Sequence, residues 1–480
     1  SGAVSGTSNV GGLIGKVAYS PDTVIRNASA TGNVTASGTK IGGFVGLSAS
    51  GSGTVIDSVA RGDVNVTEGY SRSTALAGGF IGKNQFTTLT NVSASGDVYI
   101  PDANRVGGLV GENNGESLTD AIARGNVSGD GDVGGLIGWD ACSSELIVNA
   151  TATGQVTATG DDVGGLIGFA GCSKTWENIR ATGYVMGDKQ VGGIVGDARS
   201  EIELINATAS GDVKGTQYVG GLAGELYQPT ITDSTATGDV TSTATAGSSY
   251  AGGLIGEMPA GTISASAATG NVTAAGSHAG GLIGLLQDAE PAQINESYAT
   301  GDVTGNQSVG GLAGKAIRTN ITNTYATGSV DGNASLGGLV GNVSGGNVTL
   351  SYAVGAVADE PAAGGLIGTV HNSPTVQNTY WDNQTTERTS SAGAGAESLR
   401  TVELKGDTAK TNATGFDFQH TWDVVDNETH SSYPYLRNNT QSPPPGLHEF
   451  APKPGAGGDS NDDRNSGRGD SDQSSEDSND

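Results

Sequence analysis

The chain has 480 residues, of which 81 are glycine, while aromatic residues make up 5% and charged residues 15%. This composition supplies too few large apolar side chains for one thick globular core, so it favours a thin, regularly stacked interior. Acidic residues outnumber basic ones by 50 to 23, and the resulting net charge of −27 excludes nucleic acid and anionic membranes as expected partners.

From the N-terminus to about residue 381, a string like Val-Gly-Gly-Leu-Ile-Gly occurs thirteen times, at intervals near 28 residues. A second string follows each first glycine by 18 to 21 residues, as in Ala30-Thr31-Gly32-Asn33-Val34. Such a period is typical of solenoids. The apolar segments between the strings are short, β-branched and bounded by turn residues, which predicts strands. We therefore expect an all-β fold, a parallel β-helix (β-solenoid) of about 13 coils.

The double glycines allow two predictions. Each glycine can mark a corner with a positive φ, or a place where neighbouring backbone packs too closely for a Cβ atom. Leu13 and Ile14 follow the first pair, Gly11 and Gly12, and two successive residues cannot both face inward on a regular strand. The pair is therefore expected to mark a bulge.

The two strings together, as in Val309-Gly310-Gly311-Leu312 and Tyr298-Ala299-Thr300-Gly301-Asp302-Val303, resemble the GLUG motif. This short repeat occurs in tandem in surface and secreted proteins of bacteria and archaea, including adhesin-like chains and some peptidases. The resemblance covers residues 1–381 and implies an extracellular β-solenoid scaffold without chemistry of its own. Peptidases that carry the motif keep their catalytic machinery in a separate domain, and this sequence shows no such domain.

The two cysteines of the chain, Cys142 and Cys172, each lie eight residues after the first glycine of their pair. In a parallel β-helix they would occupy one site on adjacent coils, with Cα atoms about 5 Å apart, which a disulfide accepts. We predict a disulfide and hence an oxidising, extracellular compartment, with two small buried thiols as the alternative.

Aromatic residues also share registers. Trp139 and Phe169 lie five residues after their glycines, and Tyr298, Tyr325 and Tyr352 lie three residues before a Gly-x-Val. We interpret both sets as packing stripes rather than as a platform for a ligand.

The N-glycosylation signal Asn-x-Ser/Thr is unusually frequent, which predicts an N-glycosylated exterior. The eighteen candidate asparagines are Asn27, Asn33, Asn65, Asn91, Asn126, Asn149, Asn206, Asn271, Asn295, Asn306, Asn320, Asn333, Asn342, Asn347, Asn383, Asn412, Asn427 and Asn438.

An asparagine or aspartate follows the glycine of the second string in many coils, including Asn33, Asp63, Asp97 and Asn126. We expect these side chains to stack into a ladder of turns satisfied by backbone hydrogen bonds. Calcium between successive carboxylates is the alternative, and no other cofactor is expected.

Motifs of catalysis are absent from the sequence: it has no H-E-x-x-H, no G-x-S-x-G and no phosphate-binding loop. A groove that cleaves polysaccharides needs carboxylates that converge across coils. Pairs such as Asp161 and Asp162, or Glu201 and Glu203, show no such recurrence in the sequence. We therefore expect no enzyme and no metal site.

The pattern changes after Trp381. Aromatic residues concentrate between Trp381 and Leu436, so we assign residues 1–381 to the solenoid and residues 382–440 to a small C-terminal cap. Residues 441–480 are rich in Pro, then in Gly, Asp and Ser, which predicts a linker and a disordered acidic tail. Membrane attachment is expected only through parts that are not in this chain.

These features together predict a non-enzymatic, extracellular or cell-surface protein: a glycosylated rod or stalk of a halophile, since an acidic surface suits concentrated salt. Its partners would be cell-surface or carbohydrate ligands, bound through loops such as Glu68 to Ala77 and Thr241 to Tyr250. Two alternatives stay open, a filament subunit that stacks end to end on itself and a polysaccharide-active β-helix enzyme.

Overall fold

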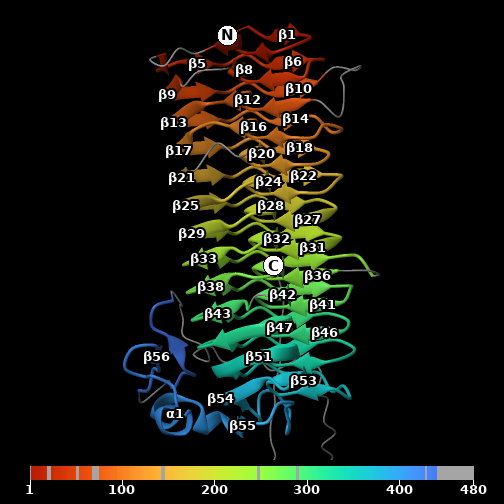
Figure 1. The fold of residues 1–480 in the computed structure, drawn as a ribbon, viewed down its shortest axis with the longest axis vertical. Coiled ribbons are helices and arrows are strands. Elements are labelled where there is room, and N and C mark those ends of the chain that lie inside the picture. The colour runs from red at the N-terminus through yellow and green to blue at the C-terminus, as the bar shows by residue number, and fades with distance from the viewer. Residues whose placement is uncertain are drawn as a thin grey trace, which may run out of the picture.

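The computed structural model describes residues 2–18, 23–49, 53–66, 75–141, 146–245, 249–287, 291–427 and 430–439. Over this part, the chain winds into a parallel β-solenoid whose coils follow one another along a single axis in chain order (Figure 1). The predicted fold is therefore confirmed. Three long sheets run along the rod, and we call them sheets A, B and C.

Sheet A is built from the second string and has twelve parallel strands in the described residues. They are β1 (Val4–Gly6), β6 (Val34–Ala36), β10 (Val64–Val66), β14 (Val98–Tyr99), β18 (Val127–Gly129), β22 (Val156–Ala158), β26 (Val185–Met186), β30 (Val213–Gly215), β35 (Val240–Ser242), β40 (Val272–Ala274), β45 (Val303–Thr304) and β49 (Val330–Asp331).

Sheet B is built from the Val-Gly of the first string and has thirteen strands in the described residues, one for each double glycine. They are β2 (Val10–Gly11), β7 (Lys40–Gly42), β11 (Leu76–Gly78), β15 (Val106–Gly107), β19 (Val133–Gly134), β23 (Val163–Gly164), β27 (Lys189–Gly192), β31 (Gln217–Gly220), β36 (Tyr250–Gly252), β41 (His278–Gly280), β46 (Ser308–Gly310), β50 (Leu336–Gly337) and β52 (Ala363–Gly364).

Sheet C takes up the rest of each coil and covers two faces of the rod. In early coils the two faces are separate strands, such as β8 (Val45–Ala49) and β9 (Gly53–Ala60), whereas β51 (Val340–Ala353) runs continuously through both. The second face bends at a residue in the left-handed region, such as Asn91 with a φ of 50°. Because the period of alternation restarts at that bend, residues on both sides of it can face the core.

The double glycine is a site of close backbone approach. A Cβ atom on Gly42 would lie 2.0 Å from the carbonyl oxygen of Val45, and one on Gly43 would lie 2.1 Å from that of Gly79 in the next coil. Neither glycine has a positive φ in the structure. Close approach, rather than a left-handed corner, is therefore why this position excludes other residues.

The predicted bulge is present at the corner that follows. The backbone N–H groups of Leu109 and Val110 both donate to the carbonyl oxygen of Leu136, at 2.8 and 2.9 Å. Both side chains are fully buried. Two residues thus oppose one acceptor, so the leucine and the β-branched residue after it can both enter the core.

The interior consists of two thin apolar columns. One is formed mainly by the valines of sheets A and B, such as Val34 and Val64. The other lies inside sheet C and contains leucine, isoleucine and alanine, with Trp176 as its largest fully buried side chain. Small side chains fill the narrow space between sheets, which agrees with the low content of aromatic residues.

A buried polar network crosses four coils of the sheet C core. Asn84 Nδ2 donates to Asn113 Oδ1 at 3.0 Å, and Asn113 Nδ2 donates to Asp140 Oδ1 at 3.0 Å. Lys174 Nζ lies 2.9 Å from Asp140 Oδ2, with the two side chains 1% and 0% exposed. Each charge is therefore compensated inside a nearly waterless core.

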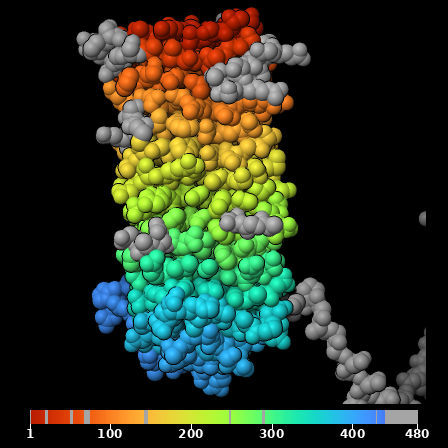
Figure 2. All heavy atoms as spheres, turned by 45° about the vertical axis from the view of Figure 1, so that its right-hand side comes forward, coloured from red at the N-terminus to blue at the C-terminus, as the bar shows by residue number. Residues whose placement is uncertain are grey.

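The C-terminal segment both closes the last coil and returns along the side of the rod. Strand β55 (Ala396–Leu399) pairs with β54 (Thr375–Asp382), which adds one more layer beyond the last complete coil. The chain continues through η2 (Thr401–Glu403), α1 (Gly406–Asn412), β56 (Trp422–Asp423) and β57 (Tyr435–Leu436). Figures 1 and 2 show this segment beside the last coils.

The tyrosine column forms the seat of that returning segment. Tyr298, Tyr325 and Tyr352 stack on successive coils with ring centroids 4.9 and 5.2 Å apart. Trp422 and Phe416 pack over them, and Trp422 lies 6.2 Å from the Tyr325 ring and 5.9 Å from the Tyr352 ring. In the structure the column is a packing stripe between the rod and the C-terminal segment.

We predict that Lys174→Met destabilises the coils around β20 (Ile137–Asp140) and β25 (Lys174–Ala181) by about 3–5 kcal/mol, because Asp140 then stays buried without its cation. Native-state hydrogen exchange of amides in these strands measures the loss. Replacing both residues, as Asp140→Leu with Lys174→Met, is expected to recover most of it. Amide exchange in the Lys174→Met variant as slow as in the wild type would contradict the prediction that Lys174 compensates the buried charge of Asp140.

Candidate functional site

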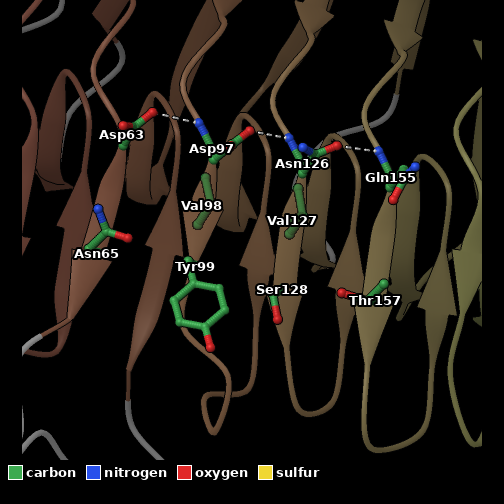
Figure 3. Close-up of a pocket in the computed structure, with 10 residues that line it drawn as sticks. All are labelled: Asp63, Asn65, Asp97, Val98, Tyr99, Asn126, Val127, Ser128, Gln155 and Thr157. Atoms are coloured by element: carbon green, nitrogen blue, oxygen red, sulfur yellow. Dashed lines mark hydrogen bonds between the residues drawn. The ribbon is translucent and has the colours of Figure 1, made fainter.

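The Asx ladder is the first functional feature along the rod, and it runs over the turns that enter sheet A. Asp63 Oδ1 accepts the N–H of Asp97 at 3.1 Å, Asp97 Oδ1 accepts that of Asn126 at 2.8 Å, and Asn126 Oδ1 accepts that of Gln155 at 3.0 Å (Figure 3). The same bond joins Asn33 to Asp63, Asp212 to Asp239, Asp239 to Asn271, Asn271 to Asp302, and Asp302 to Ser329.

The ladder of backbone-satisfied turns is thus confirmed where these residues recur. Across the described residues, no group of three or more His, Cys, Asp or Glu side chains is arranged to hold a metal ion. The carboxylates of the ladder instead receive backbone N–H groups, which fixes each turn onto the coil beside it.

Glycosylation at these turns is compatible with the ladder. In Asn33, Asn126 and Asn271 the ladder engages the Oδ1 atom. A glycan bonds to Nδ2, so the modification would leave these bonds to Oδ1 in place. Asn33 also donates from Nδ2 to Asp63 Oδ2 at 3.2 Å, and a glycan there would leave that nitrogen a single N–H.

All eighteen candidate asparagines lie within the described residues, and none of them is buried. Four exposed ones occupy one column at the left-handed bend of sheet C: Asn27, Asn91, Asn149 and Asn206, with φ between 50° and 55°. The coils between them place Asp57, Asp120 and Asn178 in the same column. Candidate glycan sites therefore recur on every second coil along one edge of the rod between residues 27 and 206, and the bend is then continued by other residues, such as Asp233 and Ala265.

A shallow hollow of about 390 Å³ lies on the outer surface of sheet A. Its floor is formed by side chains of β10, β14, β18 and β22, and its rim by the Asx ladder (Figure 3). Tyr99 stands in the hollow with 57% of its surface exposed. Asn65, Ser128 and Thr157 occupy the same position on neighbouring coils.

A second site, absent from the sequence analysis, is a column of carboxylates along the edge between sheets B and C. Asp197, Glu225 and Glu257 pair in register on three adjacent coils, in β28 (Val195–Ala198), β32 (Ala223–Leu226) and β37 (Ile255–Met258). Asp132 and Asp162 precede β19 and β23, and their side chains hydrogen-bond to each other. Asp197 and Glu257 are 1% and 7% exposed.

The expectation that carboxylates do not recur across adjacent coils was wrong for Asp162. Asp132 and Asp162 share one register, immediately before the paired valines of sheet B. Asp197, Glu225 and Glu257 share another, five residues after the first glycine of each pair, and the two registers meet where the chain turns the corner. Glu201 and Glu203 do lie elsewhere, beside Lys174 and Thr230 on the second face of sheet C.

Burial and mutual repulsion raise the pKa values of these groups. Burial, with the charges of Asp197 and Asp132, raises the pKa of Asp162 to about 8. Burial raises the pKa of Asp132 to about 6, and burial with the charge of Glu225 raises the pKa of Glu257 to about 7. Since Asp132 and Asp162 hydrogen-bond to each other, they titrate as a pair that retains a proton near neutral pH.

Cations and rings close the column on one side. Arg199 Nε donates to Asp197 Oδ2 at 2.7 Å, and its guanidinium lies 5.3 Å from the Phe169 ring. Phe169 stacks at 4.6 Å on Trp139, which Arg105 covers at 4.0 Å. Trp139 and Phe169 are therefore packing partners, as the sequence predicted, with the outer face of Trp139 occupied by a guanidinium.

The predicted disulfide cannot be placed, because Cys142 lies outside the described residues. Asp140 and Ala170, two residues before the cysteines, do pair on adjacent coils. Most of the loop Glu68 to Ala77, the centre of Thr241 to Tyr250 and the tail 441–480 also lie outside the described residues. The disulfide and the binding loops stay predictions.

The family model described as "The GLUG motif" matches residues 6–35, 73–99, 215–241 and 305–331. This chain carries GLUG repeats. Each match ends within a strand of sheet A, and three of the four begin at or directly after the sheet A strand of the coil before. The motif therefore corresponds to one coil, from sheet A through sheets B and C and back to sheet A.

Among curated proteins, the chain is similar to Halomucin of Haloquadratum walsbyi (strain DSM 16790 / HBSQ001), with 36% identity over 169 residues. That match covers 33% of this chain and 2% of the relative. Among solved structures, it is similar to a protein from Bacteroides ovatus titled "putative immunoglobulin A1 protease", at 16% identity and a TM-score of 0.26, over 80% of this chain and 87% of that one. So low a TM-score supports no functional comparison.

None of the helices in the described residues is both long and apolar enough to cross a membrane.

We predict that the solenoid loses stability as the pH rises from about 4 to about 8, because the folded carboxylate column binds protons more tightly than the unfolded chain. Asp162→Asn should remove the largest single part of this dependence and stabilise the protein at pH 9 by about 1–3 kcal/mol. Thermal unfolding between pH 5 and 9 measures the effect.

Asp161→Asn serves as the matched control, since the Asp161 side chain is 46% exposed and lies 3.7 Å from Lys189. The charge of Asp161 is the smallest of the causes that raise the pKa of Asp162, so the variant should change the pH dependence much less than Asp162→Asn does. If the thermal stability of the wild type did not change between pH 5 and 9, the charges of the carboxylate column would not destabilise the fold, and the prediction would be wrong.

Proposed function

We propose that the chain is a non-enzymatic rod that holds N-linked glycans at the extracellular surface of a halophile. The observation that carries this proposal is the placement of the eighteen candidate asparagines: none is buried, most lie on the coils of the solenoid, and several form columns along its axis. The similarity to Halomucin, a protein of Haloquadratum walsbyi, supports the proposal of a surface protein from a halophile.

The solenoid suits a mechanical role. Parallel ladders of backbone hydrogen bonds in three sheets join successive coils, and the Asx ladder adds side-chain bonds between most of them. Because every coil depends on its neighbours, the rod resists local unfolding away from its ends. Glycans fixed to such a rod would be displayed at spacings set by the coils, about 5 Å for each step.

The charge supports a saline setting. A net charge of −27 generates self-repulsion that concentrated salt screens. Additional repulsion arises in the carboxylate column, where Asp162, Asp197 and Glu225 face one another across coils. We therefore expect the fold to need high ionic strength, and full thermal stability in dilute buffer would count against a halophilic origin.

The glycosylation test uses the protein secreted by a host that N-glycosylates at Asn-x-Ser/Thr. We predict that its intact mass exceeds that of the bare chain, and that glycopeptide mapping finds sugars on the column of Asn27, Asn91, Asn149 and Asn206. Gln at these four positions should remove the part of the excess mass that this column carries while leaving the circular dichroism unchanged. A secreted chain of unmodified mass would refute a glycan-bearing rod.

A second candidate is supported by the carboxylate column, since a buried carboxyl that holds a proton beside an ionised one is the equipment of acid and base catalysis on polysaccharides. The candidate is a glycoside hydrolase with Asp132, Asp162 and Asp197 as its groups. Incubation with acidic and neutral polysaccharides tests it: cleavage that Asp162→Asn abolishes and Asp161→Asn preserves would establish an enzyme, and absence of cleavage would leave the rod.

A further inference from the structure

We propose that Asn65 carries a glycan whose first sugar packs against the exposed ring of Tyr99, so that sheet A holds its own glycan in a fixed position. This inference rests on the proposed N-glycosylation and goes beyond it by naming the sugar-binding residue and the asparagine that it serves.

The register places the two side chains side by side. Asn65 and Tyr99 pair directly between the parallel strands β10 and β14. Their neighbours Val64 and Val98 are buried in the core, at 0% and 1% exposed. Because side chains alternate along a strand, Asn65 and Tyr99 both project outward from the same face, one coil apart (Figure 3).

The ring of Tyr99 does not contribute to the packing of the solenoid. At 57% it is the most exposed aromatic side chain of the described residues. It takes part in none of the ring contacts and cation contacts that occupy the other stacked aromatics in that part of the chain. The same position holds Ser128 and Thr157 on the following coils, so the fold itself does not require an aromatic residue.

A pyranose ring has a face of C–H groups that packs on an aromatic ring, and hydroxyl groups at its edge that need hydrogen-bond partners. The hollow of about 390 Å³ beside Tyr99 offers both, with polar atoms of Asp97, Ser128 and Thr157 around it. Coils are about 4.8 Å apart, so a sugar bonded to Asn65 Nδ2 reaches the Tyr99 ring without leaving the sheet.

Asn126 also lines the hollow but fits the role less well. The strand partner of Tyr99 on this coil is Ser128, which lies two residues after Asn126. Asn126 is a member of the Asx ladder: its backbone N–H donates to Asp97, and its Oδ1 accepts the N–H of Gln155. The amide of Asn126 is thereby turned toward the next coil along the ladder, whereas Asn65 is the direct partner of the ring.

Chemical nitration of tyrosine, read by peptide mass spectrometry, tests the proposal on the full-length protein from a glycosylating host. Tyr227 is the internal control, because it is 43% exposed and no candidate asparagine is its strand partner. We expect Asn65→Gln to speed nitration of Tyr99 by at least about twofold, the ratio that matches the weak end of an aromatic stacking contact. Nitration of Tyr227 should not change, and Asn126→Gln should have no effect on Tyr99.

Glycopeptide mapping of the same sample separates the outcomes. A glycan at Asn65 with a nitration rate at Tyr99 that Asn65→Gln does not alter overturns the packing contact alone. Sugar at other asparagines but none at Asn65 overturns the assignment of the site. A protein with no sugar at any position overturns this inference together with the proposed glycosylation.

Discussion

The architecture depends on one constraint, that equivalent residues of successive coils lie directly over one another at the spacing of a parallel β-ladder. The double glycine makes this possible, because backbone from the next coil approaches Gly43 to a distance that no Cβ atom tolerates. Once the corner is fixed, the bulge at Leu109 and Val110, the Asx ladder and the stacked tyrosines all follow as consequences of the same register. The function that we propose, the display of glycans at regular spacing, would depend on the same register.

Features that repeat could be predicted from sequence, since a fixed period converts sequence spacing into contact. The Asx ladder and the Trp139 and Phe169 pair are examples. Each register of the carboxylate column also repeats, as Asp197, Glu225 and Glu257 do. What the period could not predict is that Asp162 meets Asp197 across a corner, because the period does not specify the angle of that corner. The ion pair of the polar core network was missed because Lys174 reaches Asp140 on the previous coil from the start of a different strand.

The position of the C-terminal segment could also be predicted only in part from its sequence. Its aromatic content predicted a cap on the open end of the core, and β55 does extend the last coil. The larger part of the segment instead lies along the side of the rod, over Tyr325 and Tyr352, because those rings form an apolar surface on which its aromatic residues pack. Burial of stacked rings under Trp422 stabilises this arrangement, which nothing in the local sequence of the segment encodes.

The register itself can be measured directly by cross-linking cysteines placed on sheet A. In a Cys142→Ser and Cys172→Ser background, cysteines at Thr273 and Thr304, which pair on adjacent coils and are both exposed, should form a disulfide rapidly under mild oxidation. Cysteines at Thr273 and Asp302, two positions out of register, should not. Equal rates for the two pairs, or no cross-link at Thr273 and Thr304, would contradict the stacked solenoid on which the whole account depends.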